Sequence, residues 1–432
     1  LRDVDLEKEN VTVALDWGLG QQERMRETAV NLTAAMSDYW YSRSDFNEGI
    51  LYCSRALARL PRSPVWAKLI RRKNYFLLQF GEFEEAAELA EQLFDFAEMQ
   101  EDVKLKLSAY ATVTSSLLDI NDYDKTVELA NQYWALSQSV AHSEHMFLAL
   151  NRLGSAHRFL GNNEKAIDIA WKAVNITRQQ ENDALLASAT YNLGVTLMEF
   201  GQLDQVAQLF EESLALKRLI GERAGIVRRL FMLGQISSLA NKFEEAETYL
   251  LEADQIIEDL NAPKRTMEFY FFGWAFHYEM KSDWAQAIRY TKDALHIATK
   301  FNYTSAQLGH NLMLARVYAK AGLPQQAKIY LERGATQSLA TDILAHFHTH
   351  CLLAFSRYWL TIRDLTKCAI TFIYFGESYK GHLYLKHEVE QIRSGLDAHF
   401  SAAELKALKA SLPDRDPQEV IGQQLAELQD HK

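Results

Sequence analysis

The feature of this sequence that most constrains its fold is a helical-hairpin pattern that returns about every 40 residues. Nine short polar turns mark the repeats, at Ser44, Gly81, Asn121, Gly161, Gly201, Asn241, Ser282, Gly322 and Arg363. Gly or Asn supplies the left-handed backbone that ends a helix, and Ser or Asp caps the helix that follows. A single hairpin cannot bury its apolar side alone, so this period predicts an array of stacked hairpins.

Two further positions repeat with the turns. The second residue after the first turn residue is often aromatic, as in Phe46, Phe83, Tyr123, Phe243 and Trp284. The fifth residue after it is mostly small, and the nine residues are Gly49, Ala86, Thr126, Ala166, Val206, Ala246, Ala287, Ala327 and Cys368. We expect the aromatic ring to fill the junction between helices. A small side chain should let the two helices of a hairpin approach closely.

Composition agrees with a helical chain and excludes several classes of protein. Only 6 Pro and 19 Gly occur among 432 residues, as expected for an almost wholly helical fold. The formal charge of −11 argues against DNA or RNA as the main partner, because phosphate binding needs a basic face. The three cysteines are far apart and indicate no disulfide framework, so we expect a reducing, cytoplasmic location. No uncharged apolar run of about 18 residues occurs, which predicts no membrane span.

The repeat resembles a known family. A Leu-Gly pair recurs at Leu153-Gly154, Leu193-Gly194 and Leu233-Gly234, and each pair is followed by a polar turn and a second helix. This pattern resembles the tetratricopeptide repeat (TPR) over roughly residues 25–375. The resemblance implies an all-α, TPR-like α-solenoid, a right-handed superhelix of about nine helical hairpins with a concave groove. The usual repeat has about 34 residues, so each helix here should be almost one turn longer.

The two ends of the chain depart from the pattern. We expect residues 1–24 to form an N-terminal linker helix at the end of a preceding module. Residues 25–376 should form the superhelix, and residues 377–432 should form capping helices and a polar tail. The block from Leu6 to Trp17 resembles the segment that opens the TPR region of bacterial STAND-type regulators, where an NB-ARC-like ATPase precedes it. We therefore expect this chain to be a segment of a longer protein.

Motifs for catalysis and for cofactor binding do not occur in the sequence. It has no Gly-rich phosphate loop with Lys-Ser/Thr, no Gly-x-Ser-x-Gly, no His-Glu-x-x-His and no Cys-x-x-Cys pair. We therefore expect neither an enzyme nor a bound cofactor. The best metal candidate is the pair His346 and His350, which lie four residues apart on one helix face, with His310 as a third ligand. Half-buried or solvated histidines explain the same pattern, and we predict no metal.

The resemblance places a ligand groove on the first helix of each hairpin. Transferring the groove positions of TPR arrays onto this sequence selects the residues Lys68, Arg71, Tyr75, Asn151, Ser155, Arg158, Tyr191, Arg228, Phe231, Gln235, Phe269, Phe272, Phe276, Arg316 and Arg357. Arginine and lysine recur in this set although the protein is acidic, which favours a ligand that carries carboxylates. The alternative is that these cations pair with acids of adjacent repeats, for example Glu199 or Glu279.

An aromatic run from Phe269 to Tyr278 is too dense for one buried stripe, so some of its rings should face the groove or a partner. Tighter packing of this helix is the alternative. We predict a protein or peptide ligand that is acidic, and contacts with other domains of the same polypeptide.

The predicted function is ligand sensing by the TPR domain of a larger signalling or transcription regulator. A free-standing scaffold or peptide receptor is the alternative. The coding sequence upstream of Leu1 distinguishes the two.

Overall fold

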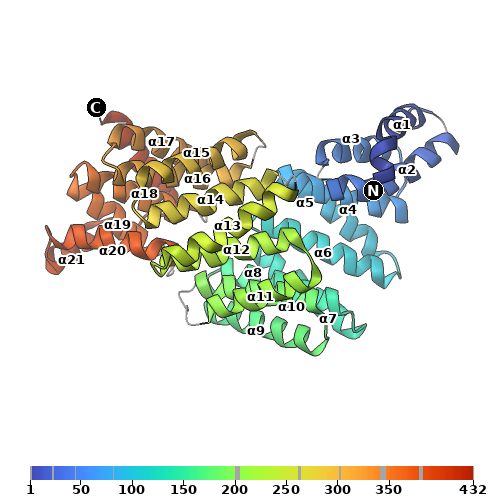
Figure 1. The fold of residues 1–432 in the computed structure, drawn as a ribbon, viewed down its shortest axis with the longest axis horizontal. Coiled ribbons are helices and arrows are strands. Elements are labelled where there is room, and N and C mark those ends of the chain that lie inside the picture. Colours follow the sequence, from blue (N-terminus) through green and yellow to red (C-terminus); the bar gives the residue numbers. More distant parts are fainter. Residues whose placement is uncertain are drawn as a thin grey trace. The chain divides into compact units, whose positions relative to one another are not determined.

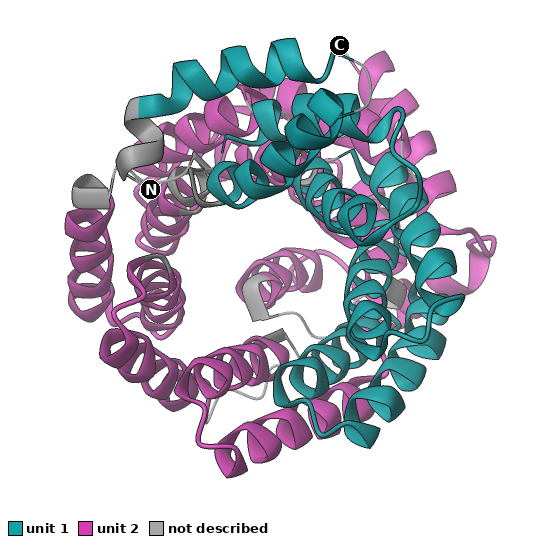
Figure 2. Cartoon of the chain, turned by 90° about the vertical axis from the view of Figure 1, so that its right-hand side faces the viewer, with its two compact units in different colours: residues 1–160 teal, residues 161–432 magenta. Residues whose placement is uncertain are grey.

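The fold consists of α-helices joined by short turns (Figure 1). The computed structural model describes residues 2–21, 24–43, 45–80, 82–199, 205–260, 264–300, 303–340, 347–378 and 383–431. These residues form 22 α-helices, and no strand occurs among them. The chain divides into two compact units, residues 1–160 and residues 161–432 (Figure 2). The all-α class predicted from the period is confirmed.

Unit 1 contains eight helices, and their bounds are α1 (Arg2–Gly18), α2 (Arg24–Arg43), α3 (Phe46–Leu57), α4 (Pro64–Phe80), α5 (Phe83–Glu98), α6 (Val103–Asp119), α7 (Tyr123–Ser139) and α8 (Ser143–Phe159). The predicted turns separate α2 from α3, α4 from α5 and α6 from α7, so each pair is one hairpin. The first helices of successive hairpins, α2, α4, α6 and α8, contact one another in that order. This side-by-side stacking is what a helical repeat array requires.

Unit 2 contains fourteen helices. Their bounds are α9 (Asn163–Gln179), α10 (Asp183–Glu199), α11 (Val206–Ile220), α12 (Arg223–Leu239), α13 (Phe243–Leu260), α14 (Lys264–Met280), α15 (Trp284–Lys300), α16 (Thr304–Lys320), α17 (Pro324–Ala340), α18 (His348–Thr361), α19 (Leu365–Ser378), α20 (Leu383–Asp397), α21 (Ala402–Ser411) and α22 (Pro417–Asp430). We call the side formed by α10, α12, α14, α16 and α18 the first-helix face of unit 2.

The predicted turns have left-handed backbone, including Ser282 and Arg363, whose residue types do not indicate it. The six described first turn residues all have positive φ, namely Asn121, Gly161, Asn241, Ser282, Gly322 and Arg363, at 59° to 73°. Ser44, Gly81 and Gly201 lie outside the described residues. A second series, Ala141, Glu181 and Gly221, also has positive φ and a spacing of 40 residues. It marks the connections between hairpins and was not predicted, because Ala and Glu carry no left-handed signal.

The small residues after the turns lie in the interior, where they leave room for neighbouring helices. All nine are buried, from Gly49 to Cys368. The Leu-Gly pairs serve the same purpose on the opposite helix. A Cβ atom at Gly194 on α10 would lie 2.7 Å from the ring of Phe210 on α11. Only glycine therefore allows α11 to approach this closely.

The C-terminal helices pack onto the last hairpins of unit 2. Helix α22 contacts α17, α18 and α19, and Trp359 Nε1 donates a hydrogen bond of 2.6 Å to Gln424 Oε1. Helix α20 contacts α18, α19 and α10. One side of α20 is buried in the core of the last hairpins through Leu385, Val389 and Ile392. The domain boundaries at residues 24 and 376 stay predictions.

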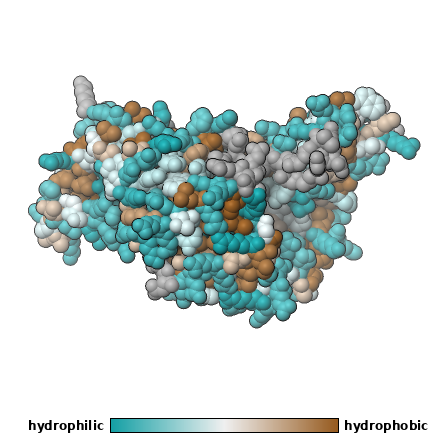
Figure 3. Space-filling view, in the orientation of Figure 1, coloured by the Kyte–Doolittle hydropathy of each residue, from teal (hydrophilic) through white to brown (hydrophobic). Residues whose placement is uncertain are grey.

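The surface mixes polar and apolar side chains, and on the face shown in Figure 3 the apolar residues lie among polar ones. Large exposed apolar residues include Trp17, Leu219 and Ile329. None of the helices within the described ranges is long and apolar enough to cross a membrane.

Candidate ligand-binding face

The predicted groove residues of unit 1 lie on α4 and α8. Lys68 Nζ donates to Asp38 Oδ2 at 3.0 Å, so it already has an acidic partner, which it shares with Arg72. The ring of Tyr75 packs against that of Tyr41 with a centroid distance of 4.9 Å. Arg71 is exposed and forms no ion pair with the described residues.

On α8, the guanidinium of Arg158 lies 4.6 Å from the ring centroid of Phe159. Asn151 and Ser155 are half-buried on the same helix. These residues therefore remain partly accessible to a ligand, and their role stays a prediction.

The predicted groove residues near the start of unit 2 divide into buried and accessible ones. Phe231, Gln235 and Phe276 are buried, each at most 5% exposed, so a ligand cannot reach them without rearrangement. Arg228 on α12 is exposed. The side chain of Phe269 lies outside the described residues.

Two aromatic residues on neighbouring helices remain half-buried. The ring of Tyr191 on α10 lies 4.4 Å from the guanidinium of Arg229, which is buried between α10 and α12. Arg229 Nη2 also donates to the carbonyl of Ala187. Phe272 on α14 has its ring centroid 5.8 Å from that of His310.

The aromatic run on α14 is used mainly for packing. Trp274 is buried and stacks on Tyr278 at 5.7 Å and on Tyr290 of α15 at 6.0 Å. Stacked aromatic pairs add about 0.5–1.5 kcal/mol beyond the burial of their area. The alternative of tighter packing therefore explains the second half of the run.

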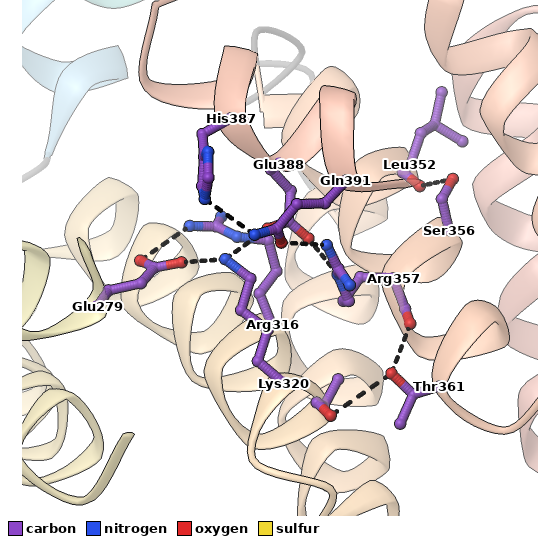
Figure 4. Close-up of polar contacts among 11 residues, drawn as sticks. Glu279, Arg316, Lys320, Leu352, Ser356, Arg357, Thr361, His387, Glu388 and Gln391 are labelled. Carbon is purple, nitrogen blue, oxygen red and sulfur yellow. Dashed lines mark hydrogen bonds and ion pairs between the residues drawn. The ribbon is translucent and has the colours of Figure 1, made fainter. Parts of the chain in front are cut away.

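The cations predicted on α16 and α18 form an ion cluster with two glutamates (Figure 4). Lys320 Nζ donates to Glu279 Oε1 of α14 at 2.9 Å, and Arg316 Nη2 lies 3.6 Å from Glu279 Oε2. The alternative that these cations pair with an acid of an adjacent repeat is thus correct for Glu279.

The second acid of the cluster comes from the C-terminal region. Glu388 on α20 accepts a hydrogen bond of 2.5 Å from Arg357 Nε and lies 2.6 Å from Lys320 Nζ. Arg357 Nη2 also donates to Gln391 Oε1 at 2.8 Å. We did not anticipate Glu388, because it lies 31 residues from Arg357 in a region predicted only to cap the array.

The two carboxylates are held in the charged state. Burial by itself raises the pKa of Glu388, but the charges of Lys320, Arg357 and Arg316 outweigh it and hold the pKa at about 2. Burial likewise raises the pKa of Glu279, and Lys320 and Arg316 lower it below its usual range. At neutral pH the cluster therefore has three positive and two negative charges, and its cations already have partners.

Several ion pairs between repeats join residues that are 34 positions apart, a spacing that can be read from the sequence. Opposite charges 34 residues apart contact each other at Lys125–Glu91, Arg178–Glu212, Arg218–Glu252 and Lys281–Glu247. A search for opposite charges at this spacing would have found these four pairs, but not the ion pairs of Arg316 and Arg357.

A chain of hydrogen bonds links Ser238, His277 and Glu247. Ser238 Oγ lies 2.9 Å from His277 Nδ1, and His277 Nε2 lies 3.1 Å from Glu247 Oε1. Ser238 and His277 are both 0% exposed, and Ser238 Oγ also lies 2.7 Å from the carbonyl oxygen of Gly234. Burial lowers the pKa of His277. The order of groups resembles a nucleophile with its base, but no substrate reaches a fully buried hydroxyl, so the chain serves to join α12, α13 and α14.

The metal candidate gains no support from the described residues. His346 lies outside them, while His310 is buried and His350 is half-buried. No group of three His, Cys, Asp or Glu side chains in the described ranges is arranged to hold a metal ion.

Comparisons with known proteins bear out the repeat assignment. The model of the tetratricopeptide repeat family matches residues 145–219. No curated protein matches the sequence.

Several solved structures are similar to this chain. The structure of a Rap protein complexed with Competence and Sporulation Factor has a TM-score of 0.58 at 16% identity, and the match covers 84% of this chain and 99% of that one. The apo form of the quorum sensor NprR from B. thuringiensis has a TM-score of 0.50 at 13% identity, with 83% and 97% covered.

A STAND protein with a tetratricopeptide repeat sensor from Pyrococcus horikoshii matches at a TM-score of 0.45 and 14% identity, with 72% of this chain and 47% of that one covered. At these identities the Rap and NprR matches show the fold alone, a TPR-like protein-interaction fold.

Proposed function

We propose that the first-helix face of unit 2 binds a peptide or protein segment that carries an acidic side chain, and that Arg228 contacts this acid. The observation that supports the proposal is the difference between Arg228 and the other predicted cations of unit 2. Arg316 and Arg357 are mostly buried and paired with Glu279 and Glu388. Arg228 is exposed on α12 and has no ion pair with the described residues.

An exposed guanidinium suits a carboxylate ligand. Its planar fork forms two parallel hydrogen bonds with a carboxylate, and such charge-assisted bonds are about twice as strong as neutral ones. The half-buried rings of Tyr191 on α10 and Phe272 on α14 offer apolar contact area on the same first-helix face. Together they fit a segment with an acidic and an apolar side chain.

Two solved structures of similar fold support a role in ligand recognition. One is a Rap protein in complex with Competence and Sporulation Factor, and the other is the quorum sensor NprR. We infer that this chain likewise works as a ligand-binding receptor module. A ligand that prefers one packing of the hairpins would shift the array toward that packing.

The wider setting of the module remains a prediction. We propose that it is the sensor of a larger signalling or transcription regulator, with a free-standing receptor or scaffold as the alternative. A phosphate-loop ATPase motif and a winged helix encoded upstream of Leu1 would support the regulator. A start codon close to Leu1 would favour the alternative.

Binding is tested with a displayed library of random peptides, selected on the unaltered chain. Acidic peptides should be enriched, and Arg228→Glu should weaken their binding about tenfold or more, because a hydrogen bond to a charged group contributes about 1.5–3 kcal/mol. Arg289→Glu is the matched control, since Arg289 is an exposed arginine on the second helix α15. Equal binding to both variants would refute the role of Arg228.

A further inference from the structure

A cavity of about 690 Å³ lies in unit 2, away from Arg228. It is lined by the end of α15, the first half of α16, the second half of α17 and Gln429 of α22. This is the edge of the array where α15 connects to α16, opposite the turns at Ser282 and Gly322. A volume of this size lies within the usual range of small-ligand sites.

The cavity wall holds a buried polar group without a partner. Asn311 is 4% exposed, and its Nδ2 donates to Gln337 Oε1 at 2.9 Å. Asn311 Oδ1 is buried and accepts no hydrogen bond from the residues that the structure describes. An unsatisfied buried acceptor costs about 1–3 kcal/mol. Asn311 lines the cavity, so a ligand N–H that reaches its Oδ1 after the side chain rearranges would remove this penalty.

The side chain of Gln337, which contacts Asn311, offers hydrogen-bond donors to a ligand in the cavity. Because Gln337 Oε1 accepts from Asn311, the two N–H bonds of Gln337 Nε2 remain for a ligand. An acceptor at Asn311 and a donor at Gln337 therefore stand side by side. A peptide group offers the complementary N–H and C=O, so the pair matches one unit of peptide backbone.

The cavity lining also includes a cation, Arg333, next to Glu332, whose carboxylate lies 4.0 Å from Lys328 Nζ. Arg333 is exposed, its guanidinium lies 5.5 Å from the ring centroid of Tyr330, and it has no ion pair with the described residues. A guanidinium in this place suits a terminal carboxylate. Ile329 adds exposed apolar surface.

We propose that this cavity binds the C-terminal end of a short peptide, with its carboxylate on Arg333 and its last backbone amide on Asn311 and Gln337. The site is separate from the face that contains Arg228. A bound peptide would contact both α17 and α22, and so would tie the C-terminal helix more firmly to the array.

The test measures binding of a mixture of synthetic tripeptides to the full chain by saturation-transfer NMR. The mixture is made once with free C-terminal carboxylates and once with C-terminal amides. The free form should bind saturably, and amidation should weaken binding about tenfold. Thr336→Trp, a change at an exposed residue in the cavity wall, should abolish binding by filling the space.

A matched pair of variants tests the carboxylate contact. Arg333→Gln should weaken binding about tenfold, whereas Arg289→Gln should leave it unchanged. Both arginines are exposed on second helices and lie over a tyrosine ring, at 5.5 Å and 5.2 Å.

Three results would overturn the proposal. The first is that the tripeptides with free carboxylates show no saturable binding. The second is that Thr336→Trp and Arg333→Gln both bind them normally. The third is that a mixture of simple saccharides displaces the tripeptides.

Discussion

Replacing Glu388 with glutamine should destabilise unit 2 strongly, although α20 lies outside the repeats that the sequence defines. The side chain of Glu388 is 4% exposed and contacts Lys320 and Arg357, which are 6% and 11% exposed. Glutamine keeps the shape but removes the charge, so both cations lose this partner. Breaking a buried pair in this way costs about 3–5 kcal/mol.

The pKa of Glu388 gives an independent magnitude. A carboxyl with a pKa of about 2 in the folded protein and about 4.3 when unfolded contributes roughly 3 kcal/mol of stability at neutral pH. The two magnitudes agree.

The sign of the pH dependence follows from the same shift. Because the folded-state pKa is lowered, the contribution is fully present above pH about 4.3 and is lost as the pH falls toward about 2. The difference between the unaltered chain and Glu388→Gln should therefore shrink over that range.

The assay is urea unfolding followed by circular dichroism, at neutral pH and at acid pH. Glu212→Gln is the control, because Glu212 forms an exposed ion pair with Arg178. The side chain of Glu212 is 34% exposed and that of Arg178 is 45% exposed. Exposed pairs contribute about 0–1 kcal/mol. If Glu388→Gln destabilises no more than Glu212→Gln, the ion cluster does not hold α20 in place.

Three further predictions concern the packing of a hairpin, the backbone of a turn and the accessibility of buried thiols. Ala246→Leu should lower the free energy of unfolding by about 1–3 kcal/mol, because Ala246 is 0% exposed and the larger side chain overpacks the α12–α13 hairpin; a neutral result in urea unfolding would contradict the close approach. Arg363→Gly should raise the midpoint of thermal unfolding, since Arg363 is exposed with φ at 63° and a left-handed non-glycine residue costs about 1–2 kcal/mol; a lower midpoint would argue against strain at this turn. Cys53 and Cys368 should resist iodoacetamide in the folded protein and react after unfolding, because burial raises both pKa values to about 12; rapid labelling of the native chain, followed by mass spectrometry, would show that these thiols are accessible.

The repeat could be predicted because its determinants are local. Asn121 and Gly322 end helices through their own backbone preferences, and Ala287 or Ala327 is small wherever two helices cross. Each of these signals acts over a few residues and returns in every copy. Nine copies in register therefore indicated the hairpins, their turns and their contact points.

The accessible part of the ligand-binding face could not be predicted in this way. Arg228, Arg316 and Arg357 look alike in sequence, since each is a cation at a predicted groove position on a first helix. Whether each cation is exposed or ion-paired depends on contacts between residues 31 to 41 positions apart. Such contacts pair Arg357 with Glu388 and Lys320 with Glu279. Such pairing is set by how helices pack.

The sequence by itself thus determined the helical hairpins and their 40-residue period. Only the tertiary structure decided which cations stay free for a ligand and which buried polar groups, such as Asn311, lack a partner. The physical reason is that backbone preferences and small residues act locally, whereas the burial and neutralisation of a charge depend on every helix packed around it.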